Sequence, residues 1–284
     1  MNMKIHLIFL QAFQTLFLII SCSGDKTSNE TMVTDQSDSI KREQIHDFWI
    51  SYRLATKKRV AGDFNEAIAS YRQALALNDQ HEDALYYLGN MYLELKQYGE
   101  AEKTWEELLV VNPASSRAHY QLGNLYMQWE NIDYFDLNLA EKKFKKVLDI
   151  NSDFLQPVLL LGQICLIKGK TEEAKKHFST VISSNDKSIE SHLLSGFIYW
   201  KQHDDDKALS FFNKAVEYAS AEKKKLSHSG EGDTKGGISL ERSLGRSIFN
   251  EILTELASSK SENNKKEMEN MYRKIENLIS AMKK

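Results

Sequence analysis

The sequence predicts an all-α fold in which short antiparallel helices follow one another as pairs. Apolar residues recur at helical spacing over stretches of about a dozen residues. Prolines (2) and glycines (13) are few in a chain of 284 residues, which favours helices. The pattern of two such stretches recurs every 34 residues, a period typical of solenoids built from one repeated unit.

The clearest pair lies at residues 82–115. Each of its two helices carries three apolar residues on one face, and neither helix can bury that face alone. A helical conformation is sterically disfavoured before proline, so Asn112-Pro113 ends the second helix. The six apolar residues are Leu85, Leu88, Tyr92, Ala101, Trp105 and Leu108.

The same pattern gives five copies, at residues 48–81, 82–115, 116–154, 155–188 and 189–222, and the third has extra residues between its helices. A small residue recurs in each first helix, where two helices must approach closely. An aromatic residue recurs in each second helix, where it fills the space between repeats. The small residues are Ala55, Gly89, Gly123, Gly162 and Gly196, and the aromatic residues are Tyr71, Trp105, Phe144, Phe178 and Phe212.

The motifs LGNMY, EAEKTW and NP in the second copy, with LGNLY and AEKKF in the third, resemble the tetratricopeptide repeat (TPR) family. The resemblance covers residues 48–222 and implies a right-handed superhelical solenoid of about five helix pairs, whose first helices line a concave groove. The closing proline of the family occurs only at Pro113. The family usually has a bulky aromatic residue at the fourth place of the repeat. In this chain that place holds Ser51, Leu85, His119, Val158 and His192.

Residues 1–21 predict a lipoprotein signal peptide. Lys4 precedes an apolar run that is shorter and more interrupted than a membrane-spanning helix. Ser21-Cys22 resembles the bacterial lipobox, although Ile19 departs from it, and the resemblance implies a lipid on Cys22. Ser23-Gly24, directly after Cys22, contains no Asp, which by the same resemblance favours the outer membrane within the bacterial cell envelope. Plain secretion and an uncleaved anchor are the alternatives.

The segments that flank the repeats are predicted from their composition. Residues 22–47 are polar and are expected to form a flexible tether. Residues 223–237 are expected to form a Gly-rich linker, and residues 238–284 a C-terminal helical pair that caps the solenoid. That pair is alternatively a docking element for a second protein or a site of self-association. Tyr134 and Phe135, in the insertion at 130–139, either pack on the neighbouring repeat or project toward a partner.

No catalytic or metal-binding motif stands out, so we predict no enzyme, no cofactor and no metal. HExxH, CxxC and GxSxG motifs are absent from the sequence, and a net charge of −3 favours neither nucleic acid nor an anionic membrane surface. His119, His192 and Cys165 are expected to pack in the core. Residues 203–206, His-Asp-Asp-Asp, are expected to form a turn and a helix N-terminus.

The TPR resemblance implies that a ligand is bound by side chains at fixed places of the first helices. Among them, a row of tyrosines and a ladder of Asn or Gln amides would contact a peptide. Asn at this place alternatively has a structural role. The carboxylate-clamp version lacks its basic residue, so capture of a C-terminal carboxylate is not expected. The candidate residues are Tyr52, Arg59, Tyr86, Asn90, Arg117, Tyr120, Asn124, Gln163, Phe197 and Trp200.

These observations together predict a membrane-anchored protein–protein interaction scaffold that binds a peptide or helix of an envelope protein, in the assembly of an envelope complex. One alternative is a chaperone-like holdase for exported proteins, although charged residues in the N-terminal half of the predicted groove disfavour broad specificity. The other, from a different class, is a cell-envelope hydrolase with a site between the solenoid and the C-terminal cap.

The lipid anchor predicts the behaviour of a single variant. Cys22→Ala removes the residue that would carry the lipid, so we expect the protein to move to the soluble fraction or to keep its leader. Cell fractionation and intact mass measure both. Cys165→Ala is the matched control and should fractionate as the wild type does. A Cys22→Ala protein that is processed and still pellets with membranes would contradict the anchor.

Overall fold

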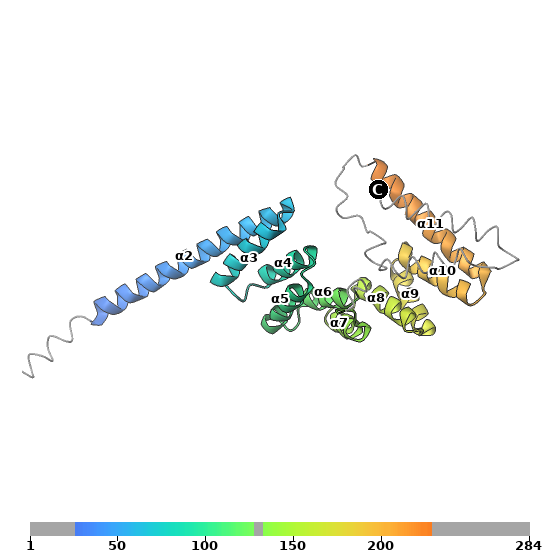
Figure 1. The fold of residues 1–284 in the computed structure, drawn as a ribbon, viewed down its shortest axis with the longest axis horizontal. Helices are drawn as coiled ribbons and strands as arrows, with labels where there is room; N and C mark the ends of the chain where they lie inside the picture. The colour runs from blue at the N-terminus through green and yellow to red at the C-terminus, as the bar shows by residue number, and fades with distance from the viewer. Residues whose placement is uncertain (1–25, 128–132, 229–284) are drawn as a thin grey trace, which may run out of the picture. The chain divides into compact units, whose positions relative to one another are not determined.

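The computed structural model describes residues 26–127 and 133–228, and every regular element in these ranges is an α-helix (Figure 1). The predicted all-α fold class is therefore confirmed. The chain divides into two compact units, Met1–Leu95 and Lys96–Lys284. Residues 1–21 and 238–284, predicted as the signal peptide and the C-terminal pair, lie outside the described ranges.

The first unit contains α2 (Lys26–Ala61), α3 (Phe64–Leu77) and α4 (Glu82–Glu94). Helix α2 packs along α3, and α3 packs on α4. Figure 1 shows α3 against the C-terminal part of α2, with the remainder of α2 extending beyond it. Gly62 makes the tight turn between α2 and α3 at φ +85°, a conformation that glycine adopts without steric cost.

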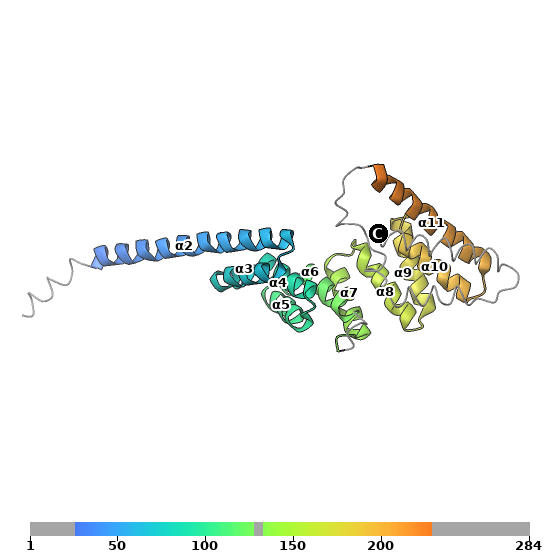
Figure 2. The ribbon, with the colours of Figure 1, turned by 45° about the horizontal axis from the view of Figure 1, so that its top comes forward.

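The second unit contains seven described helices, and each packs against the next one along the chain. The last two lie side by side in Figure 2. Helix α11 is longer than the other second helices and includes the start of the predicted linker at 223–237. The helices are α5 (Tyr98–Val111), α6 (Ser116–Tyr126), α7 (Leu137–Ile150), α8 (Leu155–Ile167), α9 (Thr171–Ser184), α10 (Ile189–Lys201) and α11 (Asp205–His228).

A contact between a glycine and an aromatic ring recurs in three helix pairs of the second unit. The ring from each second helix is fully buried against the glycine of the first helix in the same pair. A Cβ on these glycines would lie 2.6, 2.5 and 2.6 Å from the nearest ring carbon, well inside van der Waals contact. The contacts join Gly123 to Phe144, Gly162 to Phe178 and Gly196 to Phe212.

An asparagine ends the second helix of four helix pairs. Its side-chain oxygen accepts a hydrogen bond from the backbone N–H two residues later, which turns the chain toward the next first helix. The bonds are 3.3, 3.0, 3.2 and 3.2 Å long. This turn makes the closing proline dispensable, which explains why Pro113 has no counterpart in the other pairs. The asparagines are Asn78, Asn112, Asn151 and Asn185.

Polar side chains join neighbouring helix pairs of the second unit. The Lys143 ammonium donates to Glu106 at 2.6 Å. Lys168 donates to Glu141 at 2.7 Å, and Lys145 joins the same carboxylate. The two ammonium groups hold the pKa of Glu141 down, at about 2. These bonds help to align one helix pair with the next. Their contribution to the free energy of unfolding is small, because partly exposed ion pairs contribute little.

Helix α2 corrects one prediction. Residues 26–47 are helical, whereas the polar composition of residues 22–47 predicts a flexible tether. The side chains of residues 39–47 are exposed, so the helix extends here without tertiary packing. Lys, Glu and Gln in this stretch are good helix formers, and Phe48 begins the packed part that nucleates it.

The two aromatic residues of the insertion have different environments. The Tyr134 ring lies 5.9 Å from the ring of Tyr98 on α5, so Tyr134 packs on the preceding repeat. Phe135 is exposed. Asp136 then begins α7, because its carboxylate accepts hydrogen bonds from the N–H groups of Asn138 and Leu139. Tyr134 therefore packs on the neighbouring repeat, and a role of Phe135 in contacting a partner stays a prediction.

The predicted core positions of the polar residues agree with the structure. His119, His192 and Cys165 are buried. Burial raises the pKa of the Cys165 thiol, which keeps it protonated. His203 forms a turn at φ +61°, and Asp204 then accepts a hydrogen bond from the Lys207 N–H at 3.3 Å at the start of α11. Within residues 26–127 and 133–228, no helix is long and apolar enough to cross a membrane.

The glycine–ring contact predicts the effect of one methyl group. Alanine favours helix by about 1 kcal/mol over glycine. In Gly162→Ala, however, the Cβ would meet the buried Phe178 ring, and overpacking costs about 1–3 kcal/mol. We expect a net loss of stability, measured by urea unfolding followed by circular dichroism. In the double variant with Phe178→Leu the two losses should be less than additive; strict additivity would show that the contact is not the cause.

His192 predicts a loss of stability in acid. Its ring is 1% exposed between aromatic neighbours, and burial lowers its pKa to about 4, assisted by Lys214 and opposed by Asp186. Between pH 6.5 and 4 the unfolded chain binds a proton that the folded chain does not, so stability should fall as the pH falls through this window. Urea midpoints at pH 7 and pH 4.5 measure the change. His192→Phe should show a smaller change, and an equal one would contradict this assignment.

Candidate partner-binding surfaces

The ten candidate residues divide between the two units and give one candidate surface in each unit. The N-terminal surface lies on α2 and α4 of the first unit, and the C-terminal surface lies on α6, α8 and α10 of the second. The N-terminal surface contains Tyr52, Arg59, Tyr86 and Asn90. The C-terminal surface contains Arg117, Tyr120, Asn124, Gln163, Phe197 and Trp200.

The N-terminal surface rests on a buried phenylalanine. The Phe48 ring is 4% exposed and lies 5.1 Å from Trp49, 5.9 Å from Tyr52 and 4.7 Å from His81, measured between ring centroids. Trp49 itself is 42% exposed. Because the Phe48 ring already restrains the rings of Trp49 and Tyr52, these two side chains lose little conformational freedom when a partner binds. They are therefore preorganised for contact.

Tyr52 is the most strongly perturbed group of this surface. Burial raises its pKa to about 12, and the nearby Asp83 carboxylate adds to the effect. The phenol therefore stays neutral and keeps its O–H donor at physiological pH. Its ring also packs against the buried ring of Tyr71 on α3, with 5.8 Å between the ring centroids.

Arg59 is held within the first unit. Its guanidinium carbon lies 4.3 Å from the centre of the Tyr87 ring, a cation–π contact between α2 and α4. Its Nε is buried and has no hydrogen-bond partner among the described residues. Tyr86 lies beside Tyr87, and Asn90 follows one helical turn later on the same face of α4. Both are half-buried.

The α6 part of the C-terminal surface repeats the pattern of α4. Tyr120 and Asn124 are half-buried and lie one helical turn apart, and Arg117 is exposed. The Tyr120 ring packs against the rings of Phe144 and Phe154, with centroid-to-centroid distances of 6.0 and 5.2 Å. A tyrosine and an amide on one face of a helix can bury apolar area and bond a peptide backbone together.

Gln163 differs from the other members of the amide ladder. It is 0% exposed, and neither atom of its side-chain amide has a hydrogen-bond partner among the described residues. Leaving a buried amide unpaired costs about 1–3 kcal/mol. It stands in helix α8, where residues 157–165 are all buried.

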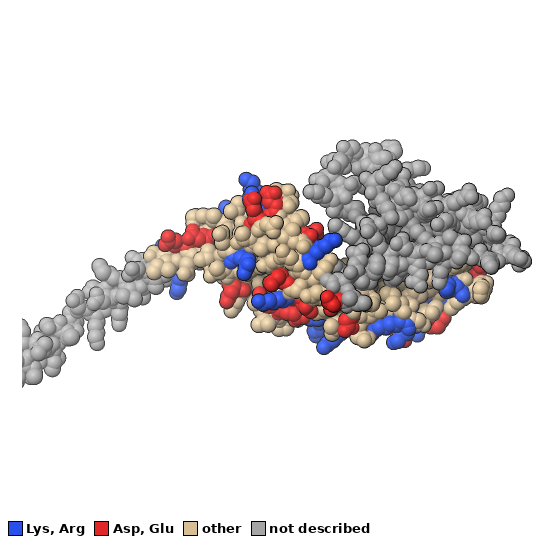
Figure 3. Space-filling view, in the orientation of Figure 1, with Lys and Arg blue, Asp and Glu red and all other residues tan. Residues whose placement is uncertain are grey.

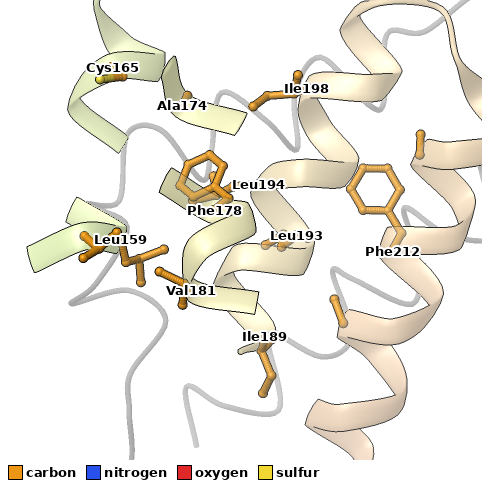
Figure 4. Close-up of a cluster of buried hydrophobic side chains, with 13 residues drawn as sticks. Leu159, Cys165, Ala174, Phe178, Val181, Ile189, Leu193, Leu194, Ile198 and Phe212 are labelled. Carbon is orange, nitrogen blue, oxygen red and sulfur yellow. The ribbon is translucent and has the colours of Figure 1, made fainter. Parts of the chain in front are cut away.

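The α10 part is apolar. Phe197 and Trp200 are half-buried, with ring centroids 6.0 Å apart, and both pack against a cluster that joins α8, α9, α10 and α11. Figure 4 shows Phe178 beside Leu194 in this cluster, with Phe212 on the other side of α10. The C-terminal surface therefore changes from polar and aromatic on α6 to apolar on α10.

Two residues that support the N-terminal surface were not among the sequence-based candidates. Tyr87 holds Arg59, and His81 contacts Phe48, Trp49 and Tyr52. His81 also accepts a hydrogen bond from the Ala84 N–H, which begins α4. The paired tyrosines at 86–87 are a visible signal, but only the structure shows that the second of them supports Arg59.

On the face in Figure 3, acidic and basic side chains are interspersed over the described residues. In the same part of the chain, no three His, Cys, Asp or Glu side chains are grouped to hold a metal ion.

Two family models match the chain, and both are described as tetratricopeptide repeat. One matches residues 61–125, and the other matches residues 156–188 and 189–222. Neither describes a catalytic family. No curated protein sequence matches the chain.

Several solved structures are similar to this one. MamA is 24% identical, with a TM-score of 0.53, covering 62% of this chain and 98% of MamA. MamA from Desulfovibrio magneticus RS-1 is 17% identical, with a TM-score of 0.56, covering 62% and 96%. YrrB, described as a TPR protein with an unusual peptide-binding site, is 22% identical, with a TM-score of 0.50, covering 59% and 84%. Residues 61–125, 156–188 and 189–222 of this chain therefore match tetratricopeptide repeats, and the solved structures show the same helical fold.

Proposed function

We propose that this protein is a lipid-anchored scaffold of the bacterial cell envelope, which binds a peptide or helix of a partner protein during the assembly of an envelope complex. The observation that carries the proposal is the set of ordered, partly exposed aromatic side chains on first helices of both units. Tyrosine, tryptophan and arginine are the residue types that contribute most to protein–protein binding.

The N-terminal surface favours a partner with apolar side chains. Trp49 offers an exposed ring, while Tyr52 and Tyr86 offer ring edges together with phenol groups. Because Phe48, Tyr71 and Tyr87 fix these rings from beneath, binding orders few side chains.

The α6 part of the C-terminal surface favours backbone recognition. The half-buried Asn124 amide can donate to a peptide carbonyl and accept from a peptide N–H, while Tyr120 covers a neighbouring side chain. The peptide-binding site named for YrrB lends support, since a protein of similar fold binds peptides.

The envelope location rests on the first residues of the chain. The apolar run followed by Ser21-Cys22 is the pattern of a lipobox, and Cys22 would carry the anchor. The outer membrane is the proposed address, because Ser23 stands where an inner-membrane retention signal has Asp.

A pair of matched variants tests the partner-binding surfaces. Affinity purification of the full chain from gently crosslinked native membranes should recover one stoichiometric partner. Tyr86→Ala with Asn90→Ala, and separately Tyr120→Ala with Asn124→Ala, should lower the recovery at least tenfold, because each removes an aromatic anchor and an amide. The helical circular dichroism signal and the melting temperature should be retained, since all four residues are half-buried.

Val110→Ala is the control, because Val110 is 84% exposed on the second helix α5 and lies outside both surfaces. It should bind as the wild type does. Equal recovery by the wild type and both double variants would sink the proposed surfaces. A mixture of many exported proteins would instead support the holdase alternative.

A further inference from the structure

Two first helices of the second unit, α6 and α8, have equivalent neighbours but different exposure. Each packs against the second helix of the preceding pair and the second helix of its own pair. In a repeat array, equivalent positions with equivalent neighbours should be equally exposed. A position that is more buried in one copy therefore has an additional neighbour.

The fifth and ninth residues of the two helices show this difference. On α6 these residues are Tyr120 and Asn124, and both are half-buried. On α8 they are Leu159 and Gln163, which are 3% and 0% exposed. The burial continues on α10, where Leu193 is 3% exposed.

The Gln163 amide indicates that the additional neighbour is specific. Its oxygen and nitrogen are buried without a hydrogen-bond partner in the described ranges, on a face that is otherwise apolar. A buried amide on an apolar face favours an occupant with a hydrogen-bond donor and an acceptor opposite Gln163. Only one alignment of the occupant along α8 places them there.

The chain itself supplies a suitable occupant. After α11 ends at His228, the sequence continues for residues 229–284, which lie outside the described ranges. Within them, the stretch 238–258 carries five apolar residues on one helical face, with Ser247 at the edge of that face. The five residues are Leu240, Leu244, Ile248, Ile252 and Leu256.

The connection is long enough for this stretch to return to α8 and α10. Helix α11 runs antiparallel to α10 and is longer by nearly a dozen residues, so its end lies beyond the start of α10. Residues 229–237, several of them glycine, can span up to about 30 Å when extended. That is about twice the length of the α11 overhang, at 1.5 Å per residue.

We propose that residues 238–258 of the same chain occupy the face formed by α8 and α10, with their apolar side chains on Leu159, Leu193 and Phe197 and a polar group bonded to Gln163. A partner that uses this face must then displace an internal segment, whereas the N-terminal surface and α6 stay accessible. The inference does not depend on the proposed function, because docking within the chain is measured without any partner.

A cleavage experiment on the detergent-solubilised full chain tests the docking. A recognition sequence for a site-specific protease is inserted between Gly236 and Gly237, and the protein is cut under native conditions. We expect the C-terminal fragment to co-elute with the body in size-exclusion chromatography, at the mass of one copy of each. Two fragments that elute separately would overturn the proposal, and so would a doubled mass, which would mean exchange between copies.

Two pairs of variants locate the contact. Leu244→Asp with Ile248→Asp places charges on the apolar face and should release the fragment after cleavage. Ser243→Asp with Asn250→Asp adds the same charge on the opposite face and should leave it bound. On the receiving surface, Gln163→Glu should also release it, with the helical circular dichroism signal retained. A fragment that stays bound in both Leu244→Asp with Ile248→Asp and Gln163→Glu would refute docking at this face.

Discussion

The contact between a first-helix glycine and the ring of a second helix determines how closely the two helices of a pair can lie. With less than 3 Å between a would-be Cβ and the ring, no side chain fits, so the helices approach until backbone meets ring. The buried rings of Phe144, Phe178 and Phe212 then fix each pair as a unit. In these three pairs, the short distance between the first and the second helix follows from that contact.

Most of the fold could be predicted because helix pairing is local. Helical spacing, the Gly–aromatic positions and the 34-residue period are all contained within one or two repeats. The extension of α2 to Lys26 could not be read from composition: polar residues favour disorder when isolated, but helix propagates readily from a packed end such as Phe48. The asparagines that end the second helices are also visible in the sequence, but the hydrogen bonds that make them turns are seen only in the structure.

The candidate site was less predictable because exposure depends on contacts between distant residues. Tyr120 and Asn124 lie one turn apart, as helical geometry requires. The burial of Gln163, however, depends on what lies over α8, and no local pattern contains that information. Likewise, the place of Arg59 depends on Tyr87, two helices away. Family resemblance therefore gave the positions of the side chains, whereas tertiary contacts decide which of them a partner can reach.

The helical form of residues 26–47 has a mechanical consequence for the lipid anchor that we propose at Cys22. A helix rises 1.5 Å per residue, so this segment is about 33 Å long and resists compression, unlike a coil of the same length. With the proposed anchor, the helix pairs that follow would be held at a set height above the membrane instead of sampling all heights down to the lipid. A stiff segment reduces the volume that the binding surfaces can reach. Their effective concentration is therefore higher for a partner at that height, and partners closer to the bilayer are not reached.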